Sequence, residues 1–239
     1  MSTTVADVKT IEDFAAQPPE YQAAVKKLVL SHAINELYGA QVFDEPAVAY
    51  APTPYWKWLT CRIAMEEYGH HVRFADLGKQ IGIPEHDMIP QMTEKKPLSI
   101  FEQTLDTFEE FAVLKMLGDL GEIIQVEDLL KCSFVPLRTA ARATMPEEKF
   151  HVKFGDDACA EICATPEGKA RIQAAIDKIF PTLPAFFGRS NSRNNAMFRE
   201  FGLKERTNEG MREDYISRAR VSVEEKLGLK LPSVDLSQY

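Results

Sequence analysis

The stretch AMEEYGHH, residues 64–71, sets Glu67 and His70 three positions apart within a segment whose apolar residues recur at helical spacing. A second stretch, PEEKFH, repeats the arrangement with Glu148 and His151. Side chains three positions apart lie on one face of a helix and can bind the same ion. One Glu-x-x-His pair is weak evidence, because charged helix surfaces produce it by chance. Two such pairs predict two halves of one metal site.

The rest of the chain supports an all-α fold. Glycine is scarce at 12 of 239 residues, and the sequence has no clear strand-like alternation and no Asn-Gly hairpin. The four long helices are predicted over about 19–43, 55–81, 100–130 and 137–164. Consecutive long helices joined by short turns predict two antiparallel hairpins that pack as a four-helix bundle.

Further helices are predicted after this bundle. A fifth helix starts at Thr165 and is interrupted at Pro181 and Pro184, and one more amphipathic helix is expected within 208–232, followed by an irregular tail. The expected organisation is a single domain over 1–239. Its core bundle covers about 19–164, and its C-terminal helices and tail cover about 165–239.

Each predicted hairpin also carries an acidic residue on its first helix. Glu36 precedes Glu67 by 31 residues, and Asp119 precedes Glu148 by 29 residues. The midpoint of each interval falls in a predicted turn, so each acid faces its own Glu-x-x-His pair about 20 Å from the turn. Two packed hairpins would therefore bring four carboxylates and two imidazoles into one layer.

This donor set is the pattern of dinuclear carboxylate centres, in which two helices each give a carboxylate and the other two each give a Glu-x-x-His. So many buried carboxylates could not remain ionised without metal, because desolvation and repulsion raise their pKa values. Spacing alone leaves alternatives open. Glu66 and Glu147 lie four residues before the histidines, Glu122 shares a helix face with Asp119 as a rival ligand, and His71 adjoins His70.

Composition restricts the classes of partner and the compartment. A net charge of −8 argues against nucleic acid or an anionic membrane as the main partner. The first residues show no secretory signal, and no apolar run approaches the roughly 20 residues that span a bilayer. The four scattered cysteines are expected to be reduced core thiols of a cytoplasmic protein.

A segment at 188–214 is rich in Arg and Lys. We expect it either to bind an anionic group or to pair with surface charges.

With these residues in view, the sequence resembles the phenylacetic acid catabolic family, the ferritin-like subunits of bacterial ring-epoxidising multicomponent monooxygenases. The likeness extends from about residue 20 to the end and is carried by SHAINELYGA, EEYGH, GDLGEIIQ, EEKFHVKFG, FPTLPAFFGRSNS and LGLKLPSVDL. It is nearest to the di-iron catalytic subunit of the phenylacetyl-CoA epoxidase type. The chain is shorter than is typical of such subunits, and EEYGHH stands where the family has DEAGH.

The resemblance implies a ligand set and favours Asp119 over Glu122. The implied ligands are Glu36, Glu67, His70, Asp119, Glu148 and His151. It also implies a cytoplasmic di-iron monooxygenase of phenylacetate or other aromatic degradation, with manganese as the alternative to iron. The substrate would be an aryl-CoA thioester or a related aromatic or unsaturated acid.

The chain has no room for a redox-cofactor domain, so the electrons would come from a separate flavin/iron–sulfur reductase. The protein would assemble with a copy of itself or with a related helical subunit. The alternative functions are a metal-oxidising or metal-storing ferritin-like protein and a non-catalytic scaffold subunit.

Overall fold

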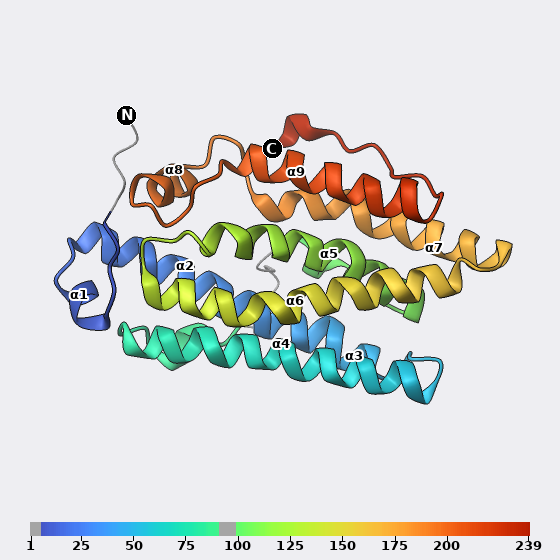
Figure 1. Cartoon of the computed structure of the whole chain (residues 1–239), viewed down its shortest axis with the longest axis horizontal. Helices are drawn as coiled ribbons and strands as arrows, with labels where there is room; N and C mark the ends of the chain where they lie inside the picture. Colours follow the sequence, from blue (N-terminus) through green and yellow to red (C-terminus); the bar gives the residue numbers. More distant parts are fainter. Residues whose placement is uncertain (1–5, 91–98) are drawn as a thin grey trace.

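The computed structural model describes residues 6–90 and 99–239, and within these ranges the chain is all α-helical, as predicted. Two antiparallel hairpins form the core. The first pairs α2 (Pro19–Gly39) with α4 (Pro54–Gln80), and the second pairs α5 (Phe108–Leu129) with α6 (Val135–Ile162). The hairpins meet where α4 packs on α6, and the C-terminal helices lie along the other side of α5 (Figure 1).

Threonine caps set the starts of two core helices. The Thr53 hydroxyl accepts the N–H of Trp56 before α4, and the Thr107 hydroxyl accepts the N–H of Glu110 before α5. The predicted start of the third helix at residue 100 is therefore wrong. Residues Ser99–Glu102 form a separate 3-10 turn, and the helix begins only after the extended backbone of Thr107.

The end of the first core helix departs from regular α geometry. At Ala40–Asp44 the chain forms a π-helical turn, which continues into the short α3 (Glu45–Ala47). Phe43 and Asp44 are buried as a result. A π turn rotates the following side chains relative to a continuous α-helix, so Asp44 faces the bundle interior.

Helices α5 and α6 approach each other closely at Gly155. A Cβ atom at this position would lie 2.2 Å from the backbone nitrogen of Met116. The close approach needs glycine, and it brings together the two helices that carry Asp119 and Glu148.

The C-terminal elements cover α5. They are α7 (Pro166–Ile179), a 3-10 segment (Phe180–Phe187), α8 (Arg193–Glu200) and α9 (Asn208–Arg220), which continues as a π-helical turn to Lys226. Thr165 caps α7, and the interruption expected at Pro181 and Pro184 is the 3-10 segment. Three short helices were not predicted: α8, within the polar 188–214 segment, α3, and α1 (Ile11–Ala15).

The structure qualifies two expectations drawn from composition. In the described part of the chain, no helix combines the length and apolar character needed to cross a bilayer. The expectation of four core thiols is wrong for Cys61, which is exposed on α4, whereas the other three cysteines are buried. Cys61 faces outward because the inner face of α4 is occupied by neighbours such as Ile63 and Ala64.

Candidate metal centre

The six residues implied by the sequence converge in the middle of the bundle. Each of the four core helices contributes, and all six side chains are buried, with both histidines at 0% exposure. They form two overlapping groups whose donor atoms lie within 4.8 Å of one another. One group is Glu36, Glu67, His70 and Glu148, and the other is Glu67, Asp119, Glu148 and His151.

Glu67 and Glu148 belong to both groups and direct one oxygen to each. Glu67 Oε2 lies 3.3 Å from His70 Nδ1, and Glu67 Oε1 lies 3.2 Å from His151 Nδ1. Glu148 Oε1 lies 3.0 Å from His70 Nδ1, and Glu148 Oε2 lies 3.8 Å from His151 Nδ1. Two carboxylates that each face both imidazoles have the arrangement needed to bridge two ions.

The first-helix acids complete the two groups separately. Glu36 Oε2 lies 3.5 Å from His70 Nδ1, and Asp119 Oδ2 lies 3.5 Å from His151 Nδ1. Each acid therefore faces the histidine of its own hairpin, as the similar intervals of 31 and 29 residues in the sequence predict.

Several donor atoms at the centre have short contacts but no hydrogen bond among the described residues. They are His70 Nδ1, His151 Nδ1 and both carboxylate oxygens of Glu148. Buried polar atoms are normally hydrogen-bonded, and the exceptions here point into one shared space. The set of two imidazole nitrogens and four carboxylates suits a pair of divalent metal ions.

The outer nitrogens of the histidines are held by a crossed pair of carboxylates. His70 on α4 donates from Nε2 to Glu147 on α6 at 3.0 Å, and His151 on α6 donates from Nε2 to Glu66 on α4 at 3.0 Å. Such contacts fix the tautomer and the orientation of a metal-binding imidazole. The structure thus places the two acids that spacing left open as ligands on the outer side of the rings.

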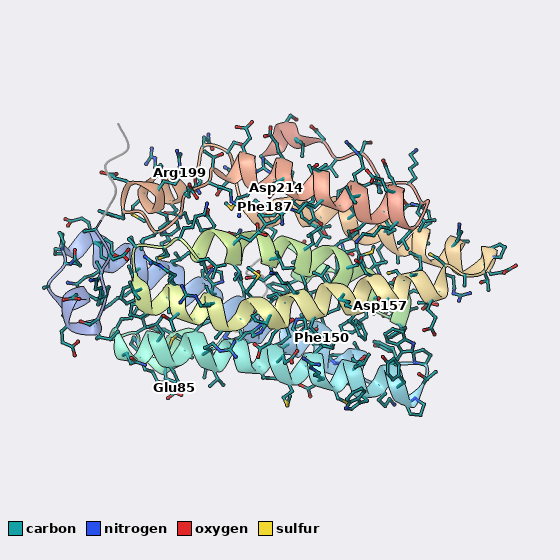
Figure 2. All side chains as sticks on the ribbon, in the orientation of Figure 1. Glu85, Phe150, Asp157, Phe187, Arg199 and Asp214 are labelled. Carbon is teal, nitrogen blue, oxygen red and sulfur yellow. The ribbon has the colours of Figure 1, made fainter. Side chains whose placement is uncertain are left out.

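Two arginines support these outer carboxylates. Arg62 donates to Glu66 at 2.8 Å and stacks 3.7 Å over the ring of Phe150, which Figure 2 shows between α4 and α6. Arg73 donates to Glu147 at 3.0 Å. The hydrogen bond from His70 lowers the pKa of Glu147 to about 2, and Arg73 adds to this shift. Partial burial of Glu147 acts in the opposite direction.

A buried lysine that no sequence pattern had singled out lies beside the donor cluster. Lys115 is 2% exposed and is one helical turn before Asp119 on α5. Its Nζ lies 2.8 Å from Asp44, 2.8 Å from Glu67 and 2.9 Å from Asp119. Burial alone would lower the pKa of Lys115, but the three carboxylates raise it well above its usual value. The ammonium therefore partly neutralises the cluster.

The buried carboxyls of the cluster differ in pKa, because their charged neighbours differ. Burial raises the pKa of Glu36 and of Asp44 to about 7. Burial also acts to raise the pKa of Glu67, but Lys115 and His151 hold it well below its ordinary value. These neighbours therefore favour the ionised form of Glu67, which is the form of a carboxyl that binds metal ions.

Glu122 occupies a neighbouring position. It groups with His32 and Glu36, and its Oε1 lies 3.6 Å from His32 Nδ1. The imidazole of His32 stacks on Phe74 with ring centroids 5.0 Å apart, and burial lowers its pKa to about 3. Glu122 thus faces a neutral imidazole on α2, while Asp119 faces His151.

A cavity of about 450 Å³ adjoins the donor cluster. Carboxylates of the cluster form one part of its lining, and side chains from the 3-10 segment, α8 and the loop after α8 form the opposite part. Figure 2 shows Phe187 between the C-terminal helices and α5, where its side chain lines the cavity. Its apolar lining includes Phe43, Phe101, Leu183, Phe186 and Phe187.

The remaining residues noted in the sequence have structural contacts. His71 bonds through Nδ1 to the carbonyl of Ala33 at 2.8 Å and so ties α4 to α2. In the 188–214 segment, Arg206 pairs with Asp128 and Asp214, and Arg212 donates to backbone carbonyls. These two arginines therefore have internal partners.

Comparison with known proteins agrees with this geometry. The sequence model of a family described as phenylacetic acid catabolic protein matches residues 1–239. The chain is 25% identical over 237 residues to a 1,2-phenylacetyl-CoA epoxidase subunit of Escherichia coli (strain K12), with 97% of this chain and 76% of that protein covered.

A solved structure is also similar. It is described as protein 19 with aldehyde deformylating oxidase activity from Synechococcus, and it matches with a TM-score of 0.64 and 16% identity over 91% of this chain and 94% of that one. At this identity the likeness shows the fold alone.

Proposed function

Because this chain belongs to the phenylacetic acid catabolic protein family, we propose that it is the catalytic subunit of an O2-dependent di-iron monooxygenase. The observation that carries the proposal is the pair of buried histidines, each facing a shared set of carboxylates through Nδ1 and an outer carboxylate through Nε2. A family member that serves only as a scaffold has no need for this arrangement.

The proposed ligands follow from the geometry of the donor atoms. Glu67 and Glu148 would hold both ions, because each directs one oxygen to each histidine. Glu36 would hold the ion on the His70 side. Asp119 rather than Glu122 would hold the ion on the His151 side, because Asp119 Oδ2 lies 3.5 Å from His151 Nδ1.

Two iron ions bound here would supply the redox chemistry by which one atom of O2 enters the substrate and the other leaves as water. The residues of the chain provide the setting for it. Glu66 and Glu147 hold the imidazole rings in one orientation, and Lys115 keeps its protons on Nζ beside Glu67 and Asp119. The apolar cavity wall limits the access of water.

The proposed reaction needs partners. The electrons would come from a separate flavin/iron–sulfur reductase, and the relative from Escherichia coli is itself named as part of a multi-subunit epoxidase. We expect a related helical subunit to dock on the outer face of α4, where Trp58, Met65 and Val72 recur every seven residues and are more than half exposed. We place the enzyme in the cytoplasm, and its four free cysteine thiols support this placement.

The proposed substrate is an aryl-CoA thioester or a related aromatic or unsaturated acid. The cavity volume of about 450 Å³ lies within the range of small-molecule sites, and its aromatic lining suits an aryl group.

Anaerobic loading with Fe(II), followed by measurement of bound iron and of O2 uptake, tests the proposal. About two irons per chain and O2 uptake that requires an organic acid or its thioester are expected. Glu67→Ala and Glu148→Ala should lose iron while the helical signal by circular dichroism persists. Asp157→Asn is the matched control, because Asp157 is exposed on the same helix as Glu148 and pairs with the exposed Lys153.

The alternatives predict different outcomes. A metal-oxidising or storage protein would consume O2 on addition of Fe(II) without any organic product. A scaffold subunit would bind no iron even after anaerobic loading. Unchanged iron content in both alanine variants would falsify the ligand assignment.

A further inference from the structure

Two lysines that line the cavity lie outside the donor cluster, the exposed Lys27 and the half-buried Lys204. Lys204, in the loop after α8, lines the cavity together with Gln125 of α5. Its Nζ donates to the side-chain oxygen of Gln125 at 2.6 Å. Among the described residues no carboxylate lies within 4.0 Å of this ammonium, whereas the nearby Arg206 and Arg218 both form ion pairs.

The surroundings of Lys204 make an unmatched ammonium costly. Burial lowers its pKa, and the nearest negative charges, on Asp128 and Glu122, act only from beyond ion-pair distance. Asp128 is already engaged by Arg206 and by two backbone N–H groups. An anionic group entering the cavity would supply the missing counter-charge.

The distance to the candidate metal site limits the size of that anion. Gln125 lies six residues after Asp119 on α5, which corresponds to about 9 Å along the helix. This axial rise is of the order of the length of a small aromatic or unsaturated acid.

The cavity lining between the donor cluster and Lys204 combines aromatic side chains with the polar side chains of Glu122 and His32. Phe186 and Phe187, in the 3-10 segment, lie against α5 at Gly121. A Cβ atom placed on Gly121 would be in van der Waals contact with both rings. The cavity therefore has the donor cluster with Lys115 at one end, aromatic side chains and the Glu122–His32 pair along its length, and the half-buried ammonium of Lys204 beside Gln125. This order is complementary to a small acid with its ring toward the metals and its carboxylate away from them.

We propose that Lys204 binds the carboxylate of a small aryl or unsaturated acid, so that the free acid, rather than its CoA thioester, is the substrate of this centre. The inference rests on the proposed oxygenase function, which it narrows to one of two substrate classes. A thioester carbonyl carries no charge and would leave the ammonium unmatched. A site built around a buried charge discriminates strongly against a neutral analogue.

Isothermal titration calorimetry tests the proposal on the full chain, both as purified and after anaerobic Fe(II) loading. The probes are phenylacetate, benzoate and cinnamate, with phenylacetamide as the neutral counterpart and phenylacetyl-CoA as the competing class. At least one acid should bind the wild type, and phenylacetate should bind more tightly than phenylacetamide. Lys204→Met should weaken acid binding about 10- to 100-fold and leave the amide within about threefold, because a hydrogen bond between charged groups is lost.

Two further variants separate charge from folding. Lys204→Arg keeps the positive charge and should retain most of the acid affinity. Lys27→Met is the matched control, because Lys27 also lines the cavity but is exposed and bonded to Asn194. It should change acid binding less than threefold.

The possible failures are distinguishable. If none of the three acids binds, if Lys204→Met binds them as the wild type does, or if phenylacetyl-CoA binds and the free acids do not, the inference is overturned and the oxygenase proposal stands. If the acids bind in a Lys204-dependent manner but no O2-dependent product forms, the oxygenase proposal is overturned and the carboxylate site stands.

Discussion

Asp44 and Glu36 make the stability of the metal-free protein sensitive to pH. Burial raises the pKa of each carboxyl to about 7, from ordinary values of 3.8 and 4.5. At a pH between the ordinary and the raised pKa, the carboxyl is protonated in the folded protein and ionised in the unfolded chain. Each group therefore stabilises the folded state below its ordinary pKa and loses that contribution as pH rises through 7. The metal-free protein should unfold more easily at pH 8 than at pH 6.

The size of the loss in unfolding free energy depends on how far pH 6 lies below the raised pKa. One pKa unit corresponds to about 1.36 kcal/mol, and pH 6 lies one unit below the raised pKa of about 7. The two carboxyls share neighbours, so together they should lose about 1.4 to 2.8 kcal/mol between pH 6 and pH 8. At about 2 to 4 °C per kcal/mol for a chain of this size, Tm should fall by roughly 3 to 11 °C.

The histidines modify this value. Burial acts to lower the pKa values of His70 and His151, but the surrounding carboxylates raise them well above 6.5, so both add to the loss of stability above pH 6.5. His32, whose pKa burial lowers to about 3, acts in the opposite direction. Its opposing contribution between pH 6 and pH 8 is below about 1 kcal/mol. The net direction is therefore a fall in stability with rising pH.

Thermal unfolding followed by circular dichroism at pH 6, 7 and 8 measures the effect. The protein is compared after chelation and after loading with Mn(II), which does not react with O2 under these conditions. Bound ions favour ionised carboxylates and neutral imidazoles, so metal should stabilise more at pH 8 than at pH 6. Asp44→Asn removes one titrating carboxyl and should flatten the pH dependence of the metal-free form.

Two results would refute this reasoning. One is a Tm of the metal-free protein that is constant or rises from pH 6 to pH 8. The other is a difference in Tm between the loaded and the metal-free protein that does not change with pH.

Three further predictions concern single side chains. Glu66→Gln and Glu147→Gln should each weaken metal affinity about 10- to 100-fold by calorimetry, because each removes the charged partner of a histidine Nε2; an unchanged affinity would mean that the outer carboxylates do not orient the rings. Lys115→Met should destabilise the metal-free protein by about 3 to 5 kcal/mol in urea unfolding, because three carboxylates lose their buried counter-charge; a loss below about 1 kcal/mol would contradict this role. Gly155→Ala should cost at least about 1 to 3 kcal/mol, because its Cβ would meet the backbone of α5 at 2.2 Å. Gly69→Ala is its helical control, with nothing within 4 Å, and should stabilise by about 0.5 to 1 kcal/mol.

The sequence by itself predicted the elements of the bundle and the chemistry of its centre. Helical periodicity and two hairpin-sized intervals were sufficient to predict four long helices. The equal depth of Glu36 and Asp119 relative to the two Glu-x-x-His pairs indicated that six donors would share one layer, because rise per residue is constant along a helix. The donor types follow from residue identity alone.

The tertiary structure decided which other side chains contact the six donors, beyond those that the Glu-x-x-His pattern contains. The rotation of a helix and the register between helices depend on the packing of whole faces, so spacing along one helix cannot show what a side chain meets on another. Glu66 and Glu147 were equally good ligands by spacing, and only the packing of α4 on α6 directed each of them to the opposite histidine.

Lys115, Asp44 and Lys204 illustrate the same limit. The π-helical turn at Ala40–Asp44 brings Asp44 to Lys115, and the loop after α8 brings Lys204 to Gln125 across 79 positions of the chain. None of these contacts has a periodic signal, because each joins an irregular segment to a helix. The sequence thus determined the helices and the residue types of the candidate donors, whereas the tertiary structure decided which donors face one another, the charges around them and the cavity beside them.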